Sequence, residues 1–334
     1  MNSRERVLAA LRRERPDRIP HCELGIDRAL AVQLMGWGPP TDQAASLESQ
    51  PYTVEEAKAL STFLSLDNIY YVLRAPVLAQ KIPGQDGRLF YGEGLLHTEA
   101  DLHLLQLPDP HDAALYADAA AFAREKGDFA AWFVTRMGIF SVMLGMGTEA
   151  FSIALYENRP LIETILDYYV DWTCALADHA AALGFDVFVT TDDMAFKSTT
   201  FFSPKVFREL VLPRYHRLAR HVTLPWVLHS DGNMLPFLDD LVNVGIAGFH
   251  PVEKGAMDIR QVKRDYGDRI CLLGNVDLNL LGLGTPEEVD AEVRGLIEDV
   301  GPAGYILTSG NSLAGYLKPE CVIAKSEAVR KYGS

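Results

Sequence analysis

The sequence predicts an α/β fold, a (β/α)8 TIM barrel in which eight short parallel strands alternate with helices. Short apolar segments each lead into a helical pattern, and their spacing is nearly even in the second half of the chain. From residue 186 onward, each apolar segment ends in polar residues, as barrel strands do at the face that carries the site. A count of eight such segments favours closure into a barrel over an open sheet.

The first half of the chain is less regular than the second. An N-terminal helix, capped by Ser3, is expected to extend the barrel. Alternating apolar residues around glycines at 77–107 predict a β-hairpin insertion. The elements expected here are a helix at 3–14, a strand at 19–24, a helix at 28–35, a polar connection at 38–52, a helix at 53–65, a strand at 67–73 and a helix at 111–126.

The second half repeats one strand–helix unit. Strand 226–229 begins with Trp226-Val227-Leu228, an apolar run typical of a strand buried on both faces. The other strands are expected at 132–137, 186–191, 246–249, 270–273 and 305–308, and the helices at 148–156, 159–183, 204–222, 234–243, 257–266, 286–299 and 319–331.

Length, composition and charge limit the class of protein. The 334 residues, 48% of them hydrophobic, suffice for one large barrel domain over 1–334. The net charge of −14 disfavours nucleic acid and anionic membrane surfaces as partners. Neither a signal peptide nor an apolar run of the ~20 residues that span a membrane is recognisable. Four dispersed cysteines without a CxxC pair indicate free thiols and a reducing cytoplasm; they are Cys22, Cys174, Cys271 and Cys321.

Polar residues gather where the predicted strands end. In a barrel these ends meet at one mouth, which predicts a site there. No GxGxxG follows the first strand and no GxxxxGK[ST] occurs, so dinucleotide and P-loop sites lack support. The strand-end residues are His21 with Glu23, Arg136, Asp192 with Asp193, His229 with Asp231 and Asn233, His250 with Glu253, Asn275 with Asp277, and Ser309 with Asn311.

His229 is the sharpest candidate in this set. It shares a face with Asp231, because the two are i and i+2 on a strand, and such a pair can hold a metal or act as acid and orienting base. A core histidine bonded to a backbone carbonyl is the alternative. Arg136 could clamp a carboxylate or pair with Asp192 or Asp193. Asn233 and Asp277 are expected to cap the helices that follow them.

Four motifs together resemble the uroporphyrinogen decarboxylase superfamily. They are Arg4-Glu5-Arg6-Val7 with Pro16-Asp17-Arg18-Ile19-Pro20, His229-Ser230-Asp231-Gly232-Asn233, Gly274-Asn275-Val276-Asp277 and Gly284-Thr285-Pro286-Glu287-Glu288-Val289. The resemblance covers nearly the whole chain and implies a (β/α)8 barrel. It also implies one of two activities, the decarboxylation of uroporphyrinogen or methyl transfer linked to cobalamin.

The methyltransferase branch resembles the chain more closely. The decarboxylases carry an RQAGR signature, whereas the equivalent residues here, 21–30, contain Arg28 as their one basic residue. The thiol-directed methyltransferases hold zinc through a His-x-Cys pair and a distant cysteine. Here the pair reads His229-Ser230-Asp231, and Asn311 occupies the distant position. The resemblance therefore implies a metal shell richer in oxygen and a stronger Lewis acid, suited to a methyl ether oxygen.

We therefore expect a corrinoid-dependent methyltransferase component that moves a methyl group between a small substrate, such as a methyl ether, and a cobalamin carried by a partner protein. Uroporphyrinogen decarboxylase-type decarboxylation of a tetrapyrrole or small carboxylic acid is the alternative, and a non-catalytic barrel that binds a corrinoid partner is a third. Zinc is a candidate metal, and a homodimer is left open. The expected catalytic residues are His229, Asp231, Asp193 and Arg136; the substrate-binding residues Glu23, Asn275 and Asn311; and the metal ligands His229, Glu23, Asp231, His250 and Glu253.

Overall fold

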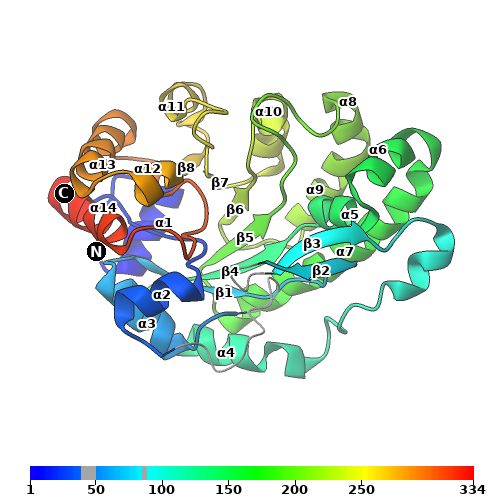
Figure 1. Cartoon of the computed structure of the whole chain (residues 1–334), viewed down its shortest axis with the longest axis horizontal. Helices are drawn as coiled ribbons and strands as arrows, with labels where there is room; N and C mark the ends of the chain where they lie inside the picture. Colours follow the sequence, from blue (N-terminus) through cyan, green and yellow to red (C-terminus); the bar gives the residue numbers. More distant parts are fainter. Residues whose placement is uncertain (39–49, 85–88) are drawn as a thin grey trace.

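A computed structural model describes residues 1–38, 50–84 and 89–334 of the chain. Within these residues a curled sheet of seven parallel strands runs in the order β1-β4-β5-β6-β7-β8-β9, with helices packed around it (Figure 1). The prediction of a curled parallel α/β sheet is confirmed, whereas the eighth regular strand is not found. The strands are β1 Asn68–Val72, β4 Ala130–Arg136, β5 Val187–Thr191, β6 Trp226–His229, β7 Gly248–His250, β8 Cys271–Val276 and β9 Tyr305–Ser309.

The missing strand is the segment 19–24, which lies between β9 and β1. It exchanges backbone hydrogen bonds with Leu307 of β9 on one side. On the other side, two of its N–H groups donate to the side chains of Asp67 and Asn68, at 3.0 and 3.1 Å. Pro20 has no N–H to donate. One backbone bond on this side runs from the Asp67 N–H to the His21 carbonyl at 2.7 Å. Because side chains accept from the N–H groups of the segment, it connects the two edge strands without becoming a regular strand.

Each sheet strand is almost completely buried. All seven residues of β4 are buried, and so are all six of β8 and all five of β9. A strand covered by helices on one face and by the barrel interior on the other has no solvent side, so its sequence reads as a continuous apolar run. This is why the strands could be located from the sequence.

Fourteen α-helices surround the sheet in the described residues. The helix predicted at 204–222 is divided into α8 and α9 by a π-turn, η3 Phe207–Val211. The helices are α1 Ser3–Leu11, α2 Arg28–Met35, α3 Val54–Phe63, α4 Ala117–Arg124, α5 Ile139–Met146, α6 Thr148–Glu157, α7 Arg159–Leu183, α8 Pro204–Val206, α9 Leu212–Ala219, α10 Leu235–Val244, α11 Ile259–Tyr266, α12 Leu278–Leu283, α13 Pro286–Val300 and α14 Pro319–Tyr332.

The N-terminal helix α1 closes the amino end of the sheet. It packs against β1, β4 and β9, and Val7, Ala10 and Leu11 are buried in that contact. Asn2, and not Ser3 as predicted, caps it, in a capping box with Glu5. With the amino end covered by an apolar helix, the carboxyl ends of the strands form the polar end of the sheet.

The predicted hairpin insertion is present as β2 Ala79–Pro83 and β3 Leu89–Gly94, an antiparallel pair beside α5 (Figure 1). Residues 85–88 of the predicted insertion and most of the predicted connection 38–52 lie outside the described residues. The remainder of the insertion forms a short 3-10 helix, η1 Glu99–Leu104, in place of further strand.

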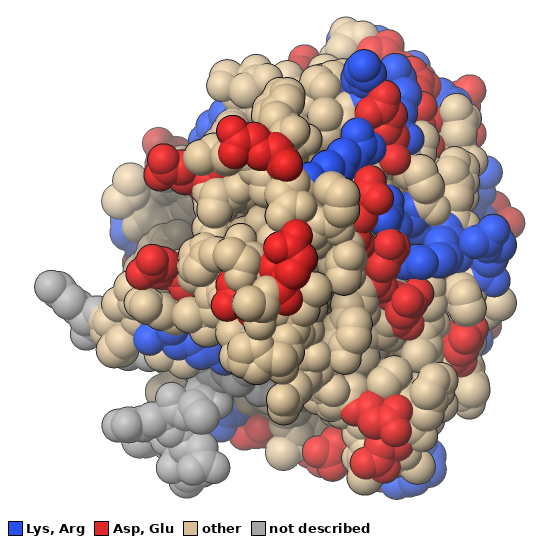
Figure 2. All heavy atoms as spheres, turned by 90° about the vertical axis from the view of Figure 1, so that its right-hand side faces the viewer, with Lys and Arg blue, Asp and Glu red and all other residues tan. Residues whose placement is uncertain are grey.

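The surface mixes both signs of charge. On the face shown in Figure 2, lysine and arginine side chains lie interspersed with aspartate and glutamate around a largely uncharged centre. Among the described residues, no single helix has both the length and the apolar composition to cross a membrane. The bent pair α5 and α6 meets those criteria only when the two are taken together, with an angle of 106° between them.

Candidate functional site

The register of three neighbouring strands brings the candidate residues together. Thr191, His229 and His250 are paired across β5, β6 and β7 at the last position of each strand. Paired residues of parallel strands point to the same face. His229 and His250 therefore stack, with ring centroids 4.9 Å apart, and the loops after β5 and β6 place two carboxylates beside His229.

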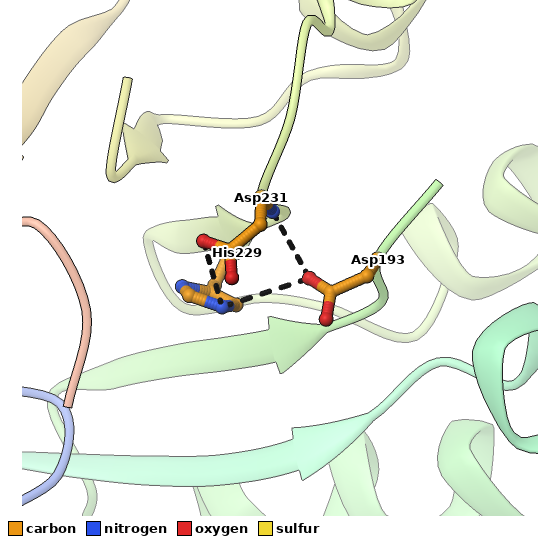
Figure 3. A group of neighbouring side chains, drawn as sticks. All are labelled: Asp193, His229 and Asp231. Carbon is orange, nitrogen blue, oxygen red and sulfur yellow. Dashed lines mark hydrogen bonds and ion pairs between the residues drawn. The ribbon is translucent and has the colours of Figure 1, made fainter. Parts of the chain in front are cut away.

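Asp193, His229 and Asp231 form one compact cluster (Figure 3). His229 Nε2 lies 3.7 Å from Asp193 Oδ1 and 3.9 Å from Asp231 Oδ1, and the Asp231 backbone N–H donates to Asp193 Oδ1 at 3.0 Å. One ligand atom from each residue lies within 4.8 Å of the other two. Ligands about 2.1 Å from a tetrahedral metal ion are about 3.4 Å apart. The three side chains therefore fit a metal ion after small rotations.

The hydrogen bonds of Asp231 leave one of its oxygens available. Oδ2 accepts a hydrogen bond of 2.6 Å from Asn311 Nδ2, whereas Oδ1 is buried and has no hydrogen-bond partner among the described residues. A buried carboxylate oxygen without a donor is costly. Two carboxylates and one histidine also carry an excess of negative charge, which a divalent cation would balance.

The pKa of Asp231 agrees with this environment. Burial raises it to about 6, His229 lowers it, and the neighbouring Asp193 raises it. At neutral pH the carboxylate is charged, which is the form that binds a metal.

Gly232 directs the chain away from the cluster directly after Asp231. Its φ of +84° lies in the region that glycine adopts without strain, and a Cβ there would lie 2.3 Å from the carbonyl oxygen of Ala195. The Gly232 N–H donates to Glu253 Oε2 at 2.7 Å. In the His-Ser-Asp-Gly segment, the histidine and aspartate therefore supply the polar groups, and the glycine supplies the backbone conformation that follows them.

A cavity of about 150 Å³ opens beside the cluster. Asp193, His229 and His250 line it together with apolar side chains and two arginines, one of them Arg136. The remaining lining residues are Leu24, Arg74, Phe140, Thr191 and Ser312.

Arg136 lines the same cavity, and its hydrogen-bond partner is a neutral side chain. It is only 8% exposed, and its Nη1 donates to the hydroxyl of Tyr91 in β3 at 3.1 Å, with the guanidinium 5.5 Å from the centre of that ring. The described residues include no carboxylate paired with Arg136. The alternative of an ion pair with Asp192 or Asp193 is therefore not what the structure has, and the hairpin insertion supplies the contact that holds Arg136 in place.

Asp192 caps a helix and takes no part in the cluster. It accepts hydrogen bonds from the backbone N–H groups of Gly138, Ile139 and Phe140 at the start of α5, at 3.4, 3.3 and 2.8 Å. Burial raises its pKa to about 7 although these three donors lower it. Asp277 caps α12, as predicted.

Three predicted ligands are held by other protein groups and do not join the cluster. Glu23 is buried against Lys325 and Ser309, which occupy both of its oxygens. Glu253 accepts from Gly232 and pairs with Lys197 at 3.4 Å. His250 lies behind His229, fully buried, and burial together with His229 holds its pKa well below the usual range. Each of these groups is already engaged by the protein.

Of the three predicted substrate-binding residues, one contacts the cluster and two do not. Asn311 contacts Asp231, and Glu23 is sequestered in the ion pair with Lys325. Asn275 donates to the carbonyl of Val252 and lines a different cavity, between α11 and α13.

For two residues of this region, no role in the site is predicted from the sequence. Lys325 lies within a predicted helix, and its spacing of i+4 from Cys321 and i−4 from Val329 places it on the buried face of α14. A lysine on an apolar helix face signals a buried partner. Arg74 directly follows the predicted strand at 67–73 and so marks another strand end at the mouth.

Comparisons with known proteins agree on the family. The family model described as uroporphyrinogen decarboxylase (URO-D) matches residues 39–332. A methylated-thiol–coenzyme M methyltransferase from Methanosarcina mazei is 31% identical over 130 residues, which are 39% of this chain and 34% of that protein. A uroporphyrinogen decarboxylase from Methylococcus capsulatus is 26% identical over 256 residues, 70% of this chain and 69% of that protein.

The fold has a solved counterpart. The structure of a methyltransferase from Methanosarcina mazei superposes with a TM-score of 0.80, at 21% identity, and covers 99% of both chains. At this identity the likeness concerns the fold. The match to the methylated-thiol relative spans only about a third of that protein's length, so its activity does not transfer by similarity alone.

Proposed function

The chain belongs to the uroporphyrinogen decarboxylase family, and from that premise we propose that it is the methyltransferase component of a corrinoid-dependent system. It moves a methyl group between a small substrate and a cobalamin carried by a partner protein. The observation that carries this proposal is the Asp193–His229–Asp231 cluster, with its unpartnered carboxylate oxygen, at the residues where the resemblance to the thiol-directed methyltransferases implies a metal. The methyltransferase relative from Methanosarcina mazei supports it.

The donor set determines which chemistry a metal would supply here. Asp193, His229 and Asp231 would hold it through two oxygens and one nitrogen, with Asn311 keeping Asp231 in place. Bound there, a zinc ion would act as a Lewis acid on the leaving oxygen of a methyl ether. Glu23, His250 and Glu253 are not included in this ligand set, because other protein groups already engage them.

The cavity supports a small anionic molecule as the proposed substrate. Arg136, buried beside a neutral tyrosine, would bind a carboxylate or a similar anion and orient the methyl group toward His229. Leu24 and Phe140 line the cavity with apolar surface and would exclude water from the transfer. A volume of about 150 Å³ suits one small ring system and not a tetrapyrrole with its many carboxylates.

The proposed setting follows from the same features. A reduced corrinoid would supply the nucleophile for the methyl group, and we propose that it would arrive on a separate protein. Four free, buried cysteines agree with a reducing cytoplasm. One barrel domain over 1–334 and assembly as a homodimer complete the proposal.

Methyl transfer to cob(I)alamin tests the proposal. The purified chain, loaded with zinc, is mixed with cob(I)alamin and a panel of methoxybenzoates, with methoxybenzyl alcohols as the neutral counterparts. We expect the absorbance change that accompanies methylcobalamin formation with an anionic donor and its loss in His229→Ala. An unchanged spectrum with every donor, and with methylcobalamin in the reverse direction, would contradict the proposal.

Decarboxylation is the second candidate, and the decarboxylase relative that aligns over 70% of this chain favours it. It needs no metal and predicts CO2 release from uroporphyrinogen or a small acid. Against the tetrapyrrole, Arg28, the one basic residue of the region equivalent to the decarboxylase signature, is paired with Glu56 at 2.6 Å and packs on Trp37. A CO2 assay with both substrate types separates this candidate from methyl transfer.

A further inference from the structure

The two histidines at the ends of β6 and β7 share a hydrogen bond whose direction can be deduced. Nδ1 of His229 lies 2.6 Å from Nδ1 of His250, so one of these nitrogens carries the proton and the other accepts it. Both rings come from paired positions of adjacent strands and lie 4.9 Å apart. Their orientation is therefore determined by the sheet register, and only the proton position remains to be assigned.

The second nitrogen of His250 settles that position. His250 Nε2 lies 3.3 Å from the carbonyl oxygen of Ser309, and a carbonyl oxygen can only accept, so Nε2 of His250 must carry a proton. His250 is 1% exposed, and its ring nitrogens contact the His229 ring and the Ser309 carbonyl, so no carboxylate of the described residues stabilises a charged ring and the buried imidazole is neutral. A neutral ring with a proton on Nε2 has a bare Nδ1. His229 must then donate from its own Nδ1.

We propose that His250 is a positioning residue that fixes the tautomer of His229, with the proton on Nδ1, so that Nε2 of His229 presents its lone pair to Asp193 and Asp231. Figure 3 shows this nitrogen directed at the two carboxylates. A neutral imidazole whose lone pair faces two carboxylates is unfavourable unless a cation lies between them. The hydrogen bond from His229 to His250 therefore orients the cluster for a metal before one binds.

A buried ion pair holds Ser309, whose carbonyl accepts the other hydrogen bond of His250. Glu23 accepts from the backbone N–H of Ser309 at 3.1 Å and also from its hydroxyl, while Lys325 of α14 compensates the charge of Glu23. Thr308 Oγ1 donates to the same Ser309 carbonyl at 2.9 Å. The carbonyl that orients His250 is thus itself anchored, which gives Glu23 and Lys325 an indirect role in the site.

Imidazole nitrogen NMR tests the tautomer directly. The full chain, labelled with 15N at histidine and free of metal, is measured at pH 8 by long-range proton–nitrogen correlation. His229→Gln and His250→Gln assign the two rings. We expect Nδ1–H on His229 and Nε2–H on His250. Finding a proton on Nε2 of His229, with or without one on Nδ1, would overturn the proposal.

Metal affinity supplies the second readout, and this part rests on the proposed function. Zinc affinity is measured by competition with a chromophoric chelator. We expect His250→Leu, which removes the acceptor, to weaken binding about 10- to 100-fold. His250→Gln keeps an acceptor for His229 and a donor for Ser309, so its affinity should stay within a few-fold of the original chain.

The controls separate the possible failures. His216→Leu, an exposed histidine on α9, should leave zinc affinity unchanged. Unchanged affinity in a folded His250→Leu would overturn the positioning role. If that variant does not fold, the tautomer of the unmodified chain decides. A chain that binds no zinc would count against the proposed metal site. The NMR measurement would still test the hydrogen bond from His229 to His250.

Discussion

Two polar clusters lie at the same end of the curled sheet, and they differ in how many of their polar atoms have hydrogen-bond or ion-pair partners within the protein. The Glu23–Lys325 pair is 1% exposed on both sides, and Ser309 donates to Glu23 through both its N–H and its hydroxyl. The Asp193–His229–Asp231 cluster is 13% to 29% exposed and leaves a buried oxygen of Asp231 without a donor. The first is complete without a ligand, and the second needs one. Incomplete satisfaction, more than the number of charged residues, distinguishes a ligand site from a structural ion pair.

Breaking the complete cluster should have the largest effect on stability. In Lys325→Met, Glu23 keeps its charge in a buried position without compensation, so we expect a loss of about 3–5 kcal/mol in the free energy of unfolding. Urea denaturation followed by circular dichroism measures it. Lys331→Met removes an exposed ion pair from the same helix and should change the unfolding midpoint very little. Equal losses of unfolding free energy in the two variants would contradict the prediction that the buried ion pair contributes more than the exposed one.

Breaking the incomplete cluster should instead affect ligand binding. Asp231→Asn removes a ligand charge and the unpartnered oxygen, so we expect zinc affinity to fall more than about 100-fold, beyond the usual effect of an outer-shell residue. The unfolding midpoint should change little. Chelator competition and urea denaturation measure the two quantities on the same samples, and Asp265→Asn on α11 is the remote control. A large loss of stability without loss of affinity would reverse the assignment of the two clusters.

Arg136 extends the comparison to the cavity wall. Losing a charge-assisted hydrogen bond costs about 1.5–3 kcal/mol, so Arg136→Met should reduce kcat/KM for anionic donors by about 10- to 150-fold. Neutral donors should react as before. Tyr91→Phe removes only the hydroxyl that holds Arg136 and should have a smaller effect in the same direction. An equal reduction for anionic and neutral donors would exclude an anion-binding role.

The last expected effect is a pH dependence from Asp192. Burial raises its pKa to about 7, so between about pH 4 and 7 the folded chain binds a proton that the unfolded chain has released. Its contribution to stability therefore falls as the pH rises through that window. In Asp192→Asn this dependence is absent, and the variant should gain stability relative to the original chain from pH 4 to pH 7. Thermal unfolding across that range measures the difference, and parallel curves would contradict it.

The reach of sequence reasoning differs between these residues for a physical reason. His229 and Asp231 were paired because strand geometry makes i and i+2 share a face, and Asp193 was found because it follows a strand. Glu23 was placed in the site because it also belongs to a strand end. Its partner Lys325 lies 302 residues further along the chain, and local spacing carries no information about such a contact. The first strand was overestimated for a related reason, since the side chains of Asp67 and Asn68 take the N–H groups that a ladder would use.

By itself, the sequence determined the parallel sheet, the hairpin insertion and the end of the barrel at which polar residues gather. All three follow from periodicity and from the order of apolar and polar segments. Only the tertiary structure decided which of those polar residues are already compensated. It separated Glu23, His250 and Glu253 from Asp193, His229 and Asp231, which a list of strand ends cannot do. Charge compensation depends on distance and burial, and both are set by segments that are neighbours in space and remote along the chain.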